Sequence, residues 1–153
     1  MLEIVEVGPG DGLQNDNVMF STAQKVAFIT RVVDAGVTRV EVASFVNPKR
    51  VPQMADAEAV IAALPQRAGV SYIGLVLNAK GFERAQQTAI HEVNLVSTTS
   101  DTFGGKNQGM TSSETAAVIE EVAPLGRKAG FKSSATVPTA FGCPFESRQG
   151  VRP

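Results

Sequence analysis

The stretch that decides the fold lies near the N-terminus and reads Val5-Glu6-Val7-Gly8-Pro9-Gly10-Asp11-Gly12-Leu13-Gln14-Asn15. Its first part, residues 4–7, is rich in β-branched residues and predicts a short strand. Residues 8–12 form the densest cluster of turn formers in the sequence and predict a tight loop. Glycine permits close backbone approach, so such a loop can fold around a ligand. Asp11 offers a carboxylate suited to a hard cation, and Gln14 offers both a donor and an acceptor.

The composition of the chain predicts an ordinary soluble globular protein. Its 153 residues, of which 43% are hydrophobic and 19% charged, have room for one domain. With 14 basic and 15 acidic residues the net charge is −1, so we expect neither nucleic acid nor a membrane as a partner. The one cysteine, Cys143, excludes an internal disulfide. The sequence shows no signal peptide or membrane-spanning run, and we expect a cytoplasmic protein.

Strand, loop and helix patterns alternate along the whole chain, which predicts right-handed parallel βαβ units. Strands are expected over residues 4–7, 39–44, 72–77, 93–96 and 132–137. Helices are expected over residues 22–35, 56–64 and 81–89, and from a cap at Ser112 or Ser113 to about residue 130. Ser21 and Gln24 fit a capping box at the start of the first helix. The polar, glycine-rich stretch 97–109 is expected to be a functional loop, because it is too long for a simple connector.

Two architectures fit this alternation: a doubly wound open sheet and part of a (β/α)8 barrel. The dinucleotide-binding fingerprint does not decide between them, because Leu13 stands at its third glycine position. Polar residues at the C-terminal ends of the expected strands favour the barrel, where enzymes of that fold keep their chemistry. These residues are Asp11, Glu41 with Ser44, Asn78, and Ser97 with Asn107.

Four stretches in this order resemble hydroxymethylglutaryl-CoA lyase, a family in the metal-dependent lyase and aldolase group of TIM barrels. They are residues 5–9 with 11–15, Ser44-Phe45-Val46-Asn47-Pro48-Lys49 with Val51-Pro52-Gln53-Met54, Asn78-Ala79-Lys80-Gly81-Phe82, and Phe141-Gly142-Cys143-Pro144-Phe145-Glu146. Related synthases share only the Asp-Gly core of the first loop. The likeness runs from about residue 3 to residue 146, and we expect one partial TIM-barrel domain over residues 1–153 with a divergent tail at 147–153.

The resemblance implies cleavage of 3-hydroxy-3-methylglutaryl-CoA, or of a relative such as citramalyl-CoA, with Mg²⁺ or Mn²⁺. Asp11 matches a metal ligand of the family, and a turn carboxylate that caps a helix is the alternative. Glu41 matches the family's active-site glutamate, and an acid satisfied within the barrel core is the alternative. Gln14, Ser44 and Asn107 are expected to face the acyl-CoA substrate, unless they only anchor their loops.

Other reactive side chains are weaker candidates. His91 precedes the fourth expected strand, at the end of a barrel opposite to the chemistry, so we expect it on the surface. Cys143 has no histidine at a suitable spacing and is expected to be a small packed thiol. Lys49, Lys80 and Lys106 could meet CoA phosphates, although solitary lysines in loops are usually only solvated.

The sequence departs from the family pattern in two ways. Gly10 stands where the family has an arginine, and neither Arg39 nor Arg50 lies at the corresponding place. A closed barrel needs eight strands and about 250 residues, whereas five strands are expected here. The metal-binding His-x-His pair of the family is absent, since His91 is the one histidine.

These departures predict a truncated homologue whose own activity is weak or absent. An open part of a barrel leaves strand edges unpaired, so we expect self-association, most simply as a homodimer. Two other functions stay open: a non-catalytic half-barrel that pairs with itself or with a complementary half, and an acyl-CoA binder without chemistry.

Overall fold

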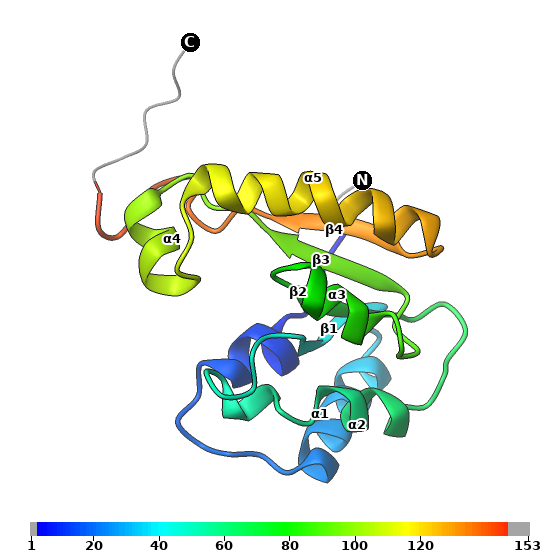
Figure 1. Ribbon diagram of the computed structural model, residues 1–153. Coiled ribbons are helices and arrows are strands. Elements are labelled where there is room, and N and C mark those ends of the chain that lie inside the picture. The colour runs from blue at the N-terminus through cyan, green and yellow to red at the C-terminus, as the bar shows by residue number, and fades with distance from the viewer. Residues whose placement is uncertain (1–2, 147–153) are drawn as a thin grey trace.

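The computed structural model describes residues 3–146, which form one curved parallel sheet with helices along it (Figure 1). The strand order is β1-β2-β3-β4, and neighbouring strands are parallel. The strands are β1 (Arg39–Ser44), β2 (Ser71–Val76), β3 (Glu92–Val96) and β4 (Lys132–Thr136). The helices are α1 (Thr22–Asp34), α2 (Ala57–Ala63), α3 (Ala79–Ala85), α4 (Asp101–Asn107) and α5 (Ser112–Lys128), with a π-helical turn η1 (Gly8–Gly12) and a 3-10 turn η2 (Pro52–Met54). The predicted βαβ alternation is confirmed.

The strand predicted at residues 4–7 is reduced to a single parallel bridge between Glu6 and Val40. The Glu6 N–H donates to the Arg39 carbonyl at 3.0 Å, and the Glu41 N–H donates to the Glu6 carbonyl at 2.8 Å. This segment therefore lies beside β1 in the position of a first strand, but its pairing is too short to count as one. The described residues thus hold four strands and a bridged segment instead of the five strands expected.

The helix starts were predicted with mixed success. The capping box of α1 is present: the Ser21 side chain accepts from the Gln24 N–H, and the Gln24 side chain accepts from the Ser21 N–H. The expected cap of α5 at Ser112 or Ser113 is wrong. Thr111 is the cap, and its own box with Glu114 satisfies two backbone N–H groups at this end of the helix. Among residues 3–146 no helix is long and apolar enough to span a membrane.

Two stretches predicted as loops are partly helical. Residues 8–12 form η1, and residues 101–107 within the expected loop 97–109 form α4. The Ser100 hydroxyl caps α4 by accepting from the Phe103 N–H at 3.0 Å. Gly104 lets the chain fold back after α4, because a Cβ at this position would lie 2.3 Å from the Met110 carbonyl oxygen. At Gly104, the glycine is therefore needed for close packing of the backbone and does not indicate a loop.

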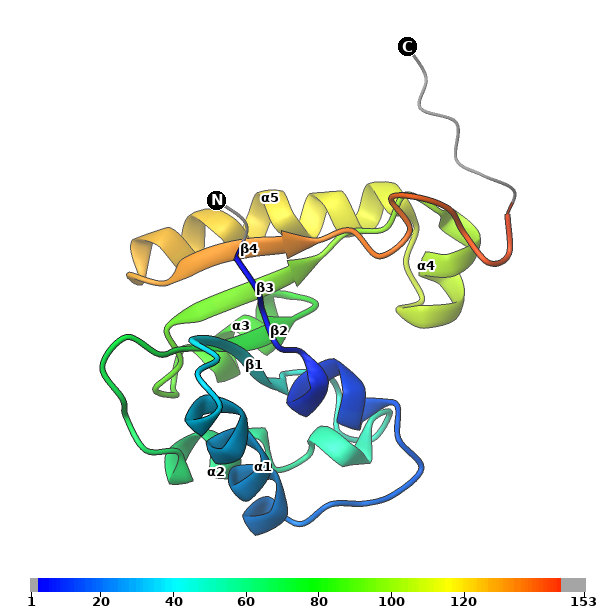
Figure 2. The ribbon, with the colours of Figure 1, turned by 180° about the vertical axis from the view of Figure 1, so that it is seen from behind.

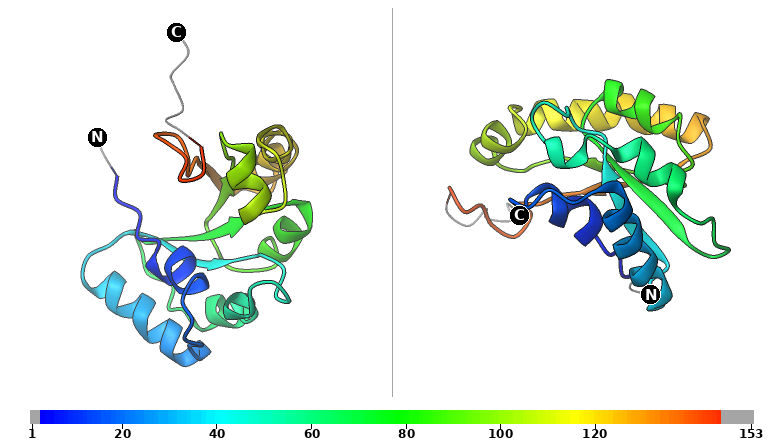
Figure 3. Two further views of the ribbon diagram at one scale, coloured as in Figure 1. Left: turned by 90° about the vertical axis from the view of Figure 1, so that its left-hand side faces the viewer. Right: turned by 90° about the horizontal axis from the view of Figure 1, so that it is seen from below.

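The two faces of the sheet differ in chemistry. On the outer face, side chains of the strands and of the helices pack together in one apolar core. From the strands it includes Val40, Val42, Tyr72, Val93 and Leu95, and from the helices Ile29, Ile61, Phe82 and Val122. Figure 3, left, shows α1, α2, α3 and α5 on the outside of the curved sheet, and Figure 2 shows the strands in front of α3 and α5. Because side chains alternate along a strand, Glu41, Glu92 and Asn94 lie on the other face. That inner face carries the polar groups of the site.

A largely buried ion pair joins α1 to the start of α2. The Lys25 side chain is 4% exposed and lies 2.5 Å from Asp56 Oδ1, and the Thr22 hydroxyl donates to Asp56 Oδ2 at 2.7 Å. The Lys25 ammonium also donates to the Gln53 carbonyl.

We expect Asp56→Ala to lower the free energy of unfolding by about 3 kcal/mol, since it leaves the lysine charge buried without its partner. Asp34→Ala is the matched control, because the Asp34–Arg67 pair is largely exposed and should be worth under about 1 kcal/mol. Urea unfolding of both variants measures the difference, and equal losses would contradict it.

Candidate functional site

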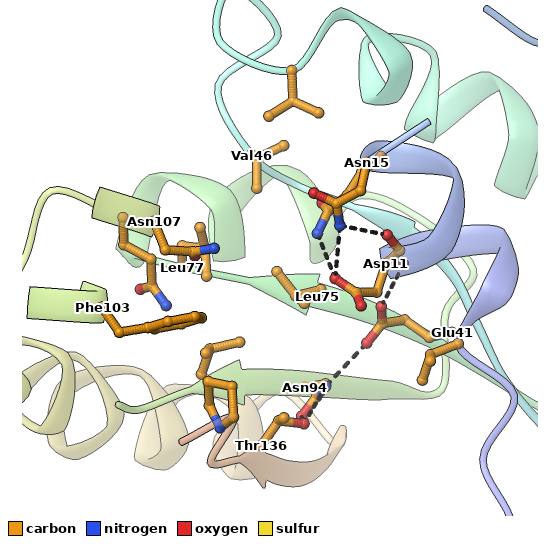
Figure 4. A pocket seen from close by; sticks show the side chains of 16 residues that line it. Asp11, Asn15, Glu41, Val46, Leu75, Leu77, Asn94, Phe103, Asn107 and Thr136 are labelled. Atoms are coloured by element: carbon orange, nitrogen blue, oxygen red, sulfur yellow. Dashed lines mark hydrogen bonds between the residues drawn. The ribbon is translucent and has the colours of Figure 1, made fainter. Parts of the chain in front are cut away.

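A pocket of about 410 Å³ opens at the C-terminal ends of the strands (Figure 4). Each part of its wall comes from a different element: η1, the four strands, α4 and the connecting loops. Its polar lining consists of Asp11, Gln14, Asn15, Glu41, Asn94, Asn107, Gln108 and Thr136, and its apolar lining includes Leu75, Leu77 and Phe103. The carboxyl ends of parallel strands meet at one edge of the sheet, which explains why residues distant in sequence gather here.

Glu41 lies at the base of this pocket and is 1% exposed. Its Oε1 accepts the Asp11 backbone N–H at 3.2 Å, and its Oε2 accepts the Asn94 amide at 3.0 Å. Burial raises the pKa of Glu41 from 4.5 to about 7; the Asn94 hydrogen bond opposes this rise and the nearby Asp11 charge adds to it. The group can therefore hold or release a proton near neutral pH, as a general acid or base must.

Asp11 stands above Glu41 and keeps its carboxylate exposed. Its Oδ1 accepts from Gln14 Nε2 at 2.8 Å, while the Asn15 amide donates to the Asp11 backbone carbonyl at 2.8 Å. These contacts are local to η1 and the turn after it, and they fix the direction of the carboxylate. Figure 4 shows Asp11 and Asn15 on one side of the pocket, with Phe103 and Asn107 on the opposite side.

The residues of the pocket do not complete a metal site by themselves. Within residues 3–146 no three His, Cys, Asp or Glu side chains gather in a way that could hold a metal ion. Asp11 could supply one oxygen ligand, and both oxygens of Glu41 already accept hydrogen bonds. No lysine or arginine is among the described residues that line the pocket, so two carboxylates face it without a compensating positive side chain.

The structure brings four of the five predicted site residues together. Asp11, Gln14, Glu41 and Asn107 all line the pocket. Ser44 is not among the residues that line it: its side chain is 0% exposed, and its hydroxyl has no hydrogen-bond partner among the described residues.

The other reactive side chains lie outside the pocket. His91 is exposed at the N-terminal end of β3, as expected, and its Nδ1 accepts the Tyr72 N–H at 3.0 Å. Cys143 is the packed thiol expected; it is 8% exposed, and its sulfur lies 3.0 Å from the Ser100 hydroxyl. Arg39 is at the far end of β1, where it pairs with Glu3 and Glu92.

Sequence reasoning missed Asn94, a residue of β3 whose amide forms hydrogen bonds with Glu41 on β1 and with Thr136 on β4. Besides donating to Glu41, its amide donates to the Thr136 hydroxyl on β4 at 3.0 Å. The signal was present, because Asn94 is a polar residue inside the apolar run Val93-Asn94-Leu95-Val96. A buried amide in such a strand needs polar partners, and a barrel interior provides them.

The fold and the pocket together define part of a (β/α)8 barrel whose polar residues gather at the C-terminal ends of its strands. The HMGL-like family model matches residues 1–152. The chain is 36% identical over 143 residues to the hydroxymethylglutaryl-CoA lyase YngG of Bacillus subtilis, and 38% identical over 145 residues to the human cytoplasmic 3-hydroxy-3-methylglutaryl-CoA lyase. It therefore belongs to the HMGL-like family.

Solved structures agree with this assignment. The crystal structure of the Bacillus subtilis HMG-CoA lyase superimposes with a TM-score of 0.92 at 35% identity. An HMG-CoA lyase from Acinetobacter baumannii, solved with coenzyme A and 3-methylmalate, gives 0.90 at 34% identity. These matches cover 97% of this chain but 50% and 48% of the two solved chains. The 153 residues thus span about half the length of these relatives.

The raised pKa of Glu41 predicts how stability depends on pH in metal-free buffer. A carboxyl whose folded pKa lies above its unfolded value of 4.5 stabilises the fold fully below that value, and the contribution is lost as the pH rises through about 7. We expect the loss to reach about 3 kcal/mol by pH 8.5, at about 1.4 kcal/mol per pKa unit.

Thermal unfolding of the wild type and Glu41→Gln between pH 5 and 8.5 measures this effect. Glutamine keeps the shape without a titrating proton, so the variant should show a flatter dependence over that range. Parallel curves for the two proteins would show that Glu41 does not titrate as described.

Proposed function

We propose that this chain is a hydroxymethylglutaryl-CoA lyase homologue that forms the substrate pocket of the enzyme but has weak or no activity alone. The observation that carries the proposal is the pocket itself: Asp11, Glu41, Gln14 and Asn107 meet there in a chain of this family. The substrate class is an acyl-CoA with a 3-hydroxy acid, either 3-hydroxy-3-methylglutaryl-CoA or a relative such as citramalyl-CoA. The complex of one relative with coenzyme A and 3-methylmalate supports that class.

In this proposal Glu41 is the catalytic residue. Cleavage requires a base to take the tertiary hydroxyl proton, and a carboxyl with a pKa of about 7 is suited to that exchange. Asp11 is the proposed ligand for Mg²⁺ or Mn²⁺, which resemblance to the family implies. Gln14 and Asn107 are proposed to orient the substrate from opposite walls.

The same pocket explains why little activity is expected from the chain alone. The enolate that develops on the thioester needs positive charge or preorganised donors beside it. The described lining residues provide no positive side chain, and they do not complete a metal site.

The direct test is turnover of 3-hydroxy-3-methylglutaryl-CoA with Mg²⁺ or Mn²⁺, measured beside the Bacillus subtilis lyase. We expect a rate at least about 100-fold below that of the relative, the cost typical of losing one preorganised charged donor. A rate equal to that of the relative would overturn the proposed inactivity.

Binding of Mn²⁺, followed by electron paramagnetic resonance, tests the role of Asp11 separately. Asp11→Ala should weaken binding by about 10-fold, the effect expected when a ligand or its support is removed from a metal site. Asp16→Ala should leave it unchanged, because Asp16 is an exposed carboxylate of the same loop outside the pocket. Equal effects of the two variants would remove Asp11 from the proposed site.

A second candidate function is a non-catalytic half-barrel that pairs with itself or with a complementary half. The exposed edges of the sheet favour it. Four of the five residues of β4 are exposed, and on the opposite side Ile4 is 80% and Val7 is 41% exposed. Such edges are templates for pairing with another chain.

We expect sedimentation velocity to show a homodimer. Ala135→Pro should weaken it: the Lys132 N–H donates to the His91 carbonyl on the β3 side, so the Ala135 N–H points to the free edge. A monodisperse wild-type monomer would contradict self-association. An unchanged dimer in the variant would exclude β4 as the interface.

A further inference from the structure

Arg50 extends from the loop after β1 toward the end of α4, and both of these segments form walls of the pocket. The residue after it, Val51, lines the pocket, and so does Gln108 at the end of α4. Arg50 Nη1 lies 3.9 Å from the place where a Cβ on Gly109 would stand. Arg50 is exposed and is not itself among the lining residues. Its guanidinium therefore lies at the rim of the pocket, between these two walls.

The backbone that carries Arg50 is held in place by hydrogen bonds. The Arg50 N–H donates to the Asn47 carbonyl at 2.9 Å, and the Val51 N–H donates to the same carbonyl at 3.0 Å. At the base of the loop, Arg84 Nη1 donates to the Val46 carbonyl at 2.9 Å. The loop thus presents Arg50 at the rim without having to fold around a ligand first.

The guanidinium of Arg50 has no partner within the described part of the chain: it makes no hydrogen bond and no ion pair there. Arg39 and Arg84, in contrast, pair with glutamates of the fold. A guanidinium is a planar fork of donors that fits two oxygens of a phosphate or carboxylate. Arg50 is therefore a positive group, free to bind an oxyanion, beside a pocket whose own lining has no positive side chain.

We propose that Arg50 binds the phosphate groups of the acyl-CoA ligand at the rim of this pocket. The inference rests on the proposed function, which places the acyl group beside Asp11 and Glu41. In CoA the pantetheine chain separates the phosphates from the thioester, so the phosphates lie outside the pocket when the acyl group lies at its base. A carboxylate of the acyl group enters the pocket instead. Arg50 thereby favours the CoA ester over the free hydroxy acid.

The test is isothermal titration calorimetry of the whole chain with CoA, at one fixed salt concentration. We expect Arg50→Gln to weaken CoA binding by about 10-fold, the effect typical of losing a hydrogen bond between charged groups. Arg50→Lys should lose less, since it keeps the charge without the planar fork. Neither variant should change the Tm by more than about 2 °C, because the side chain has no partner in the described fold.

Two control variants separate this contact from the general charge of the chain. Lys49→Gln removes the neighbouring exposed charge of the same loop. Arg31→Gln removes an exposed charge in the last turn of α1. Both should bind CoA within about threefold of the wild type, because exposed charges that make no direct contact are screened by salt.

Two smaller ligands identify the group that Arg50 binds. Pantetheine has the arm of CoA without its phosphates, and 3-hydroxy-3-methylglutarate has the acid without CoA. Wild type and Arg50→Gln should bind each of them with equal affinity. If Arg50→Gln weakens binding of the free acid as much as binding of CoA, Arg50 contacts a carboxylate and the proposed phosphate contact is wrong.

The remaining outcomes distinguish the inference from the proposed function. Unchanged CoA affinity in Arg50→Gln, or an equal loss in Lys49→Gln, would overturn the role of Arg50 and leave the proposed substrate class standing. A wild-type chain that binds no CoA would overturn both.

Discussion

The burial of one carboxylate constrains the whole C-terminal edge of the sheet. Glu41 is 1% exposed, and a carboxyl in that environment must be hydrogen-bonded or neutral. Its donors come from two distant parts of the chain, the Asp11 N–H in η1 and the Asn94 amide in β3. Because Asn94 also bonds Thr136 on β4, the network links the N-terminal turn to the last strand of the sheet. The geometry of the pocket therefore depends on where Glu41 lies.

The difference between the two sheet faces follows from the barrel architecture. The outer face is covered by helices and packs as an apolar core around residues such as Val40, Val93 and Leu95. The inner face carries Arg39, Glu41, Glu92 and Asn94, which pair among themselves and with η1. Ile73 lies beside Glu41 on this face and Leu75 lies beside Asn94, so the inner face mixes polar and apolar side chains. The helices bury the outer face as the apolar core of the fold. The C-terminal end of the inner face forms the candidate pocket.

The sequence alone predicts what local physical chemistry determines. The strand at 39–44 matches β1 residue for residue, and the Ser21–Gln24 capping box is present, because alternation and capping act over a few residues. The helical turns η1 and α4 were missed, since glycine-rich composition predicts loops and the close contacts of Gly10 and Gly104 are tertiary. Position at a strand end gathered Asp11 and Glu41 correctly. Ser44 is fully buried and is not among the residues that line the pocket, so its position at a strand end did not bring it there.

The charge of the pocket limits what it can bind without help. The proposed acyl-CoA ligand would bring phosphates, and a carboxylate as well, toward a pocket that is lined by the carboxyl groups of Asp11 and Glu41. Two like unit charges 4 Å apart near a protein surface repel by on the order of 4 kcal/mol. Two processes would relieve this repulsion. One is protonation of Glu41, whose pKa of about 7 lies near neutral pH, and the other is a cation beside Asp11. An arginine at position 10 would be a third, but Gly10 stands there in this chain. For the proposed lyase reaction, positive charge would have to come from groups other than the described residues that line this pocket. This requirement separates a substrate pocket from a complete active site.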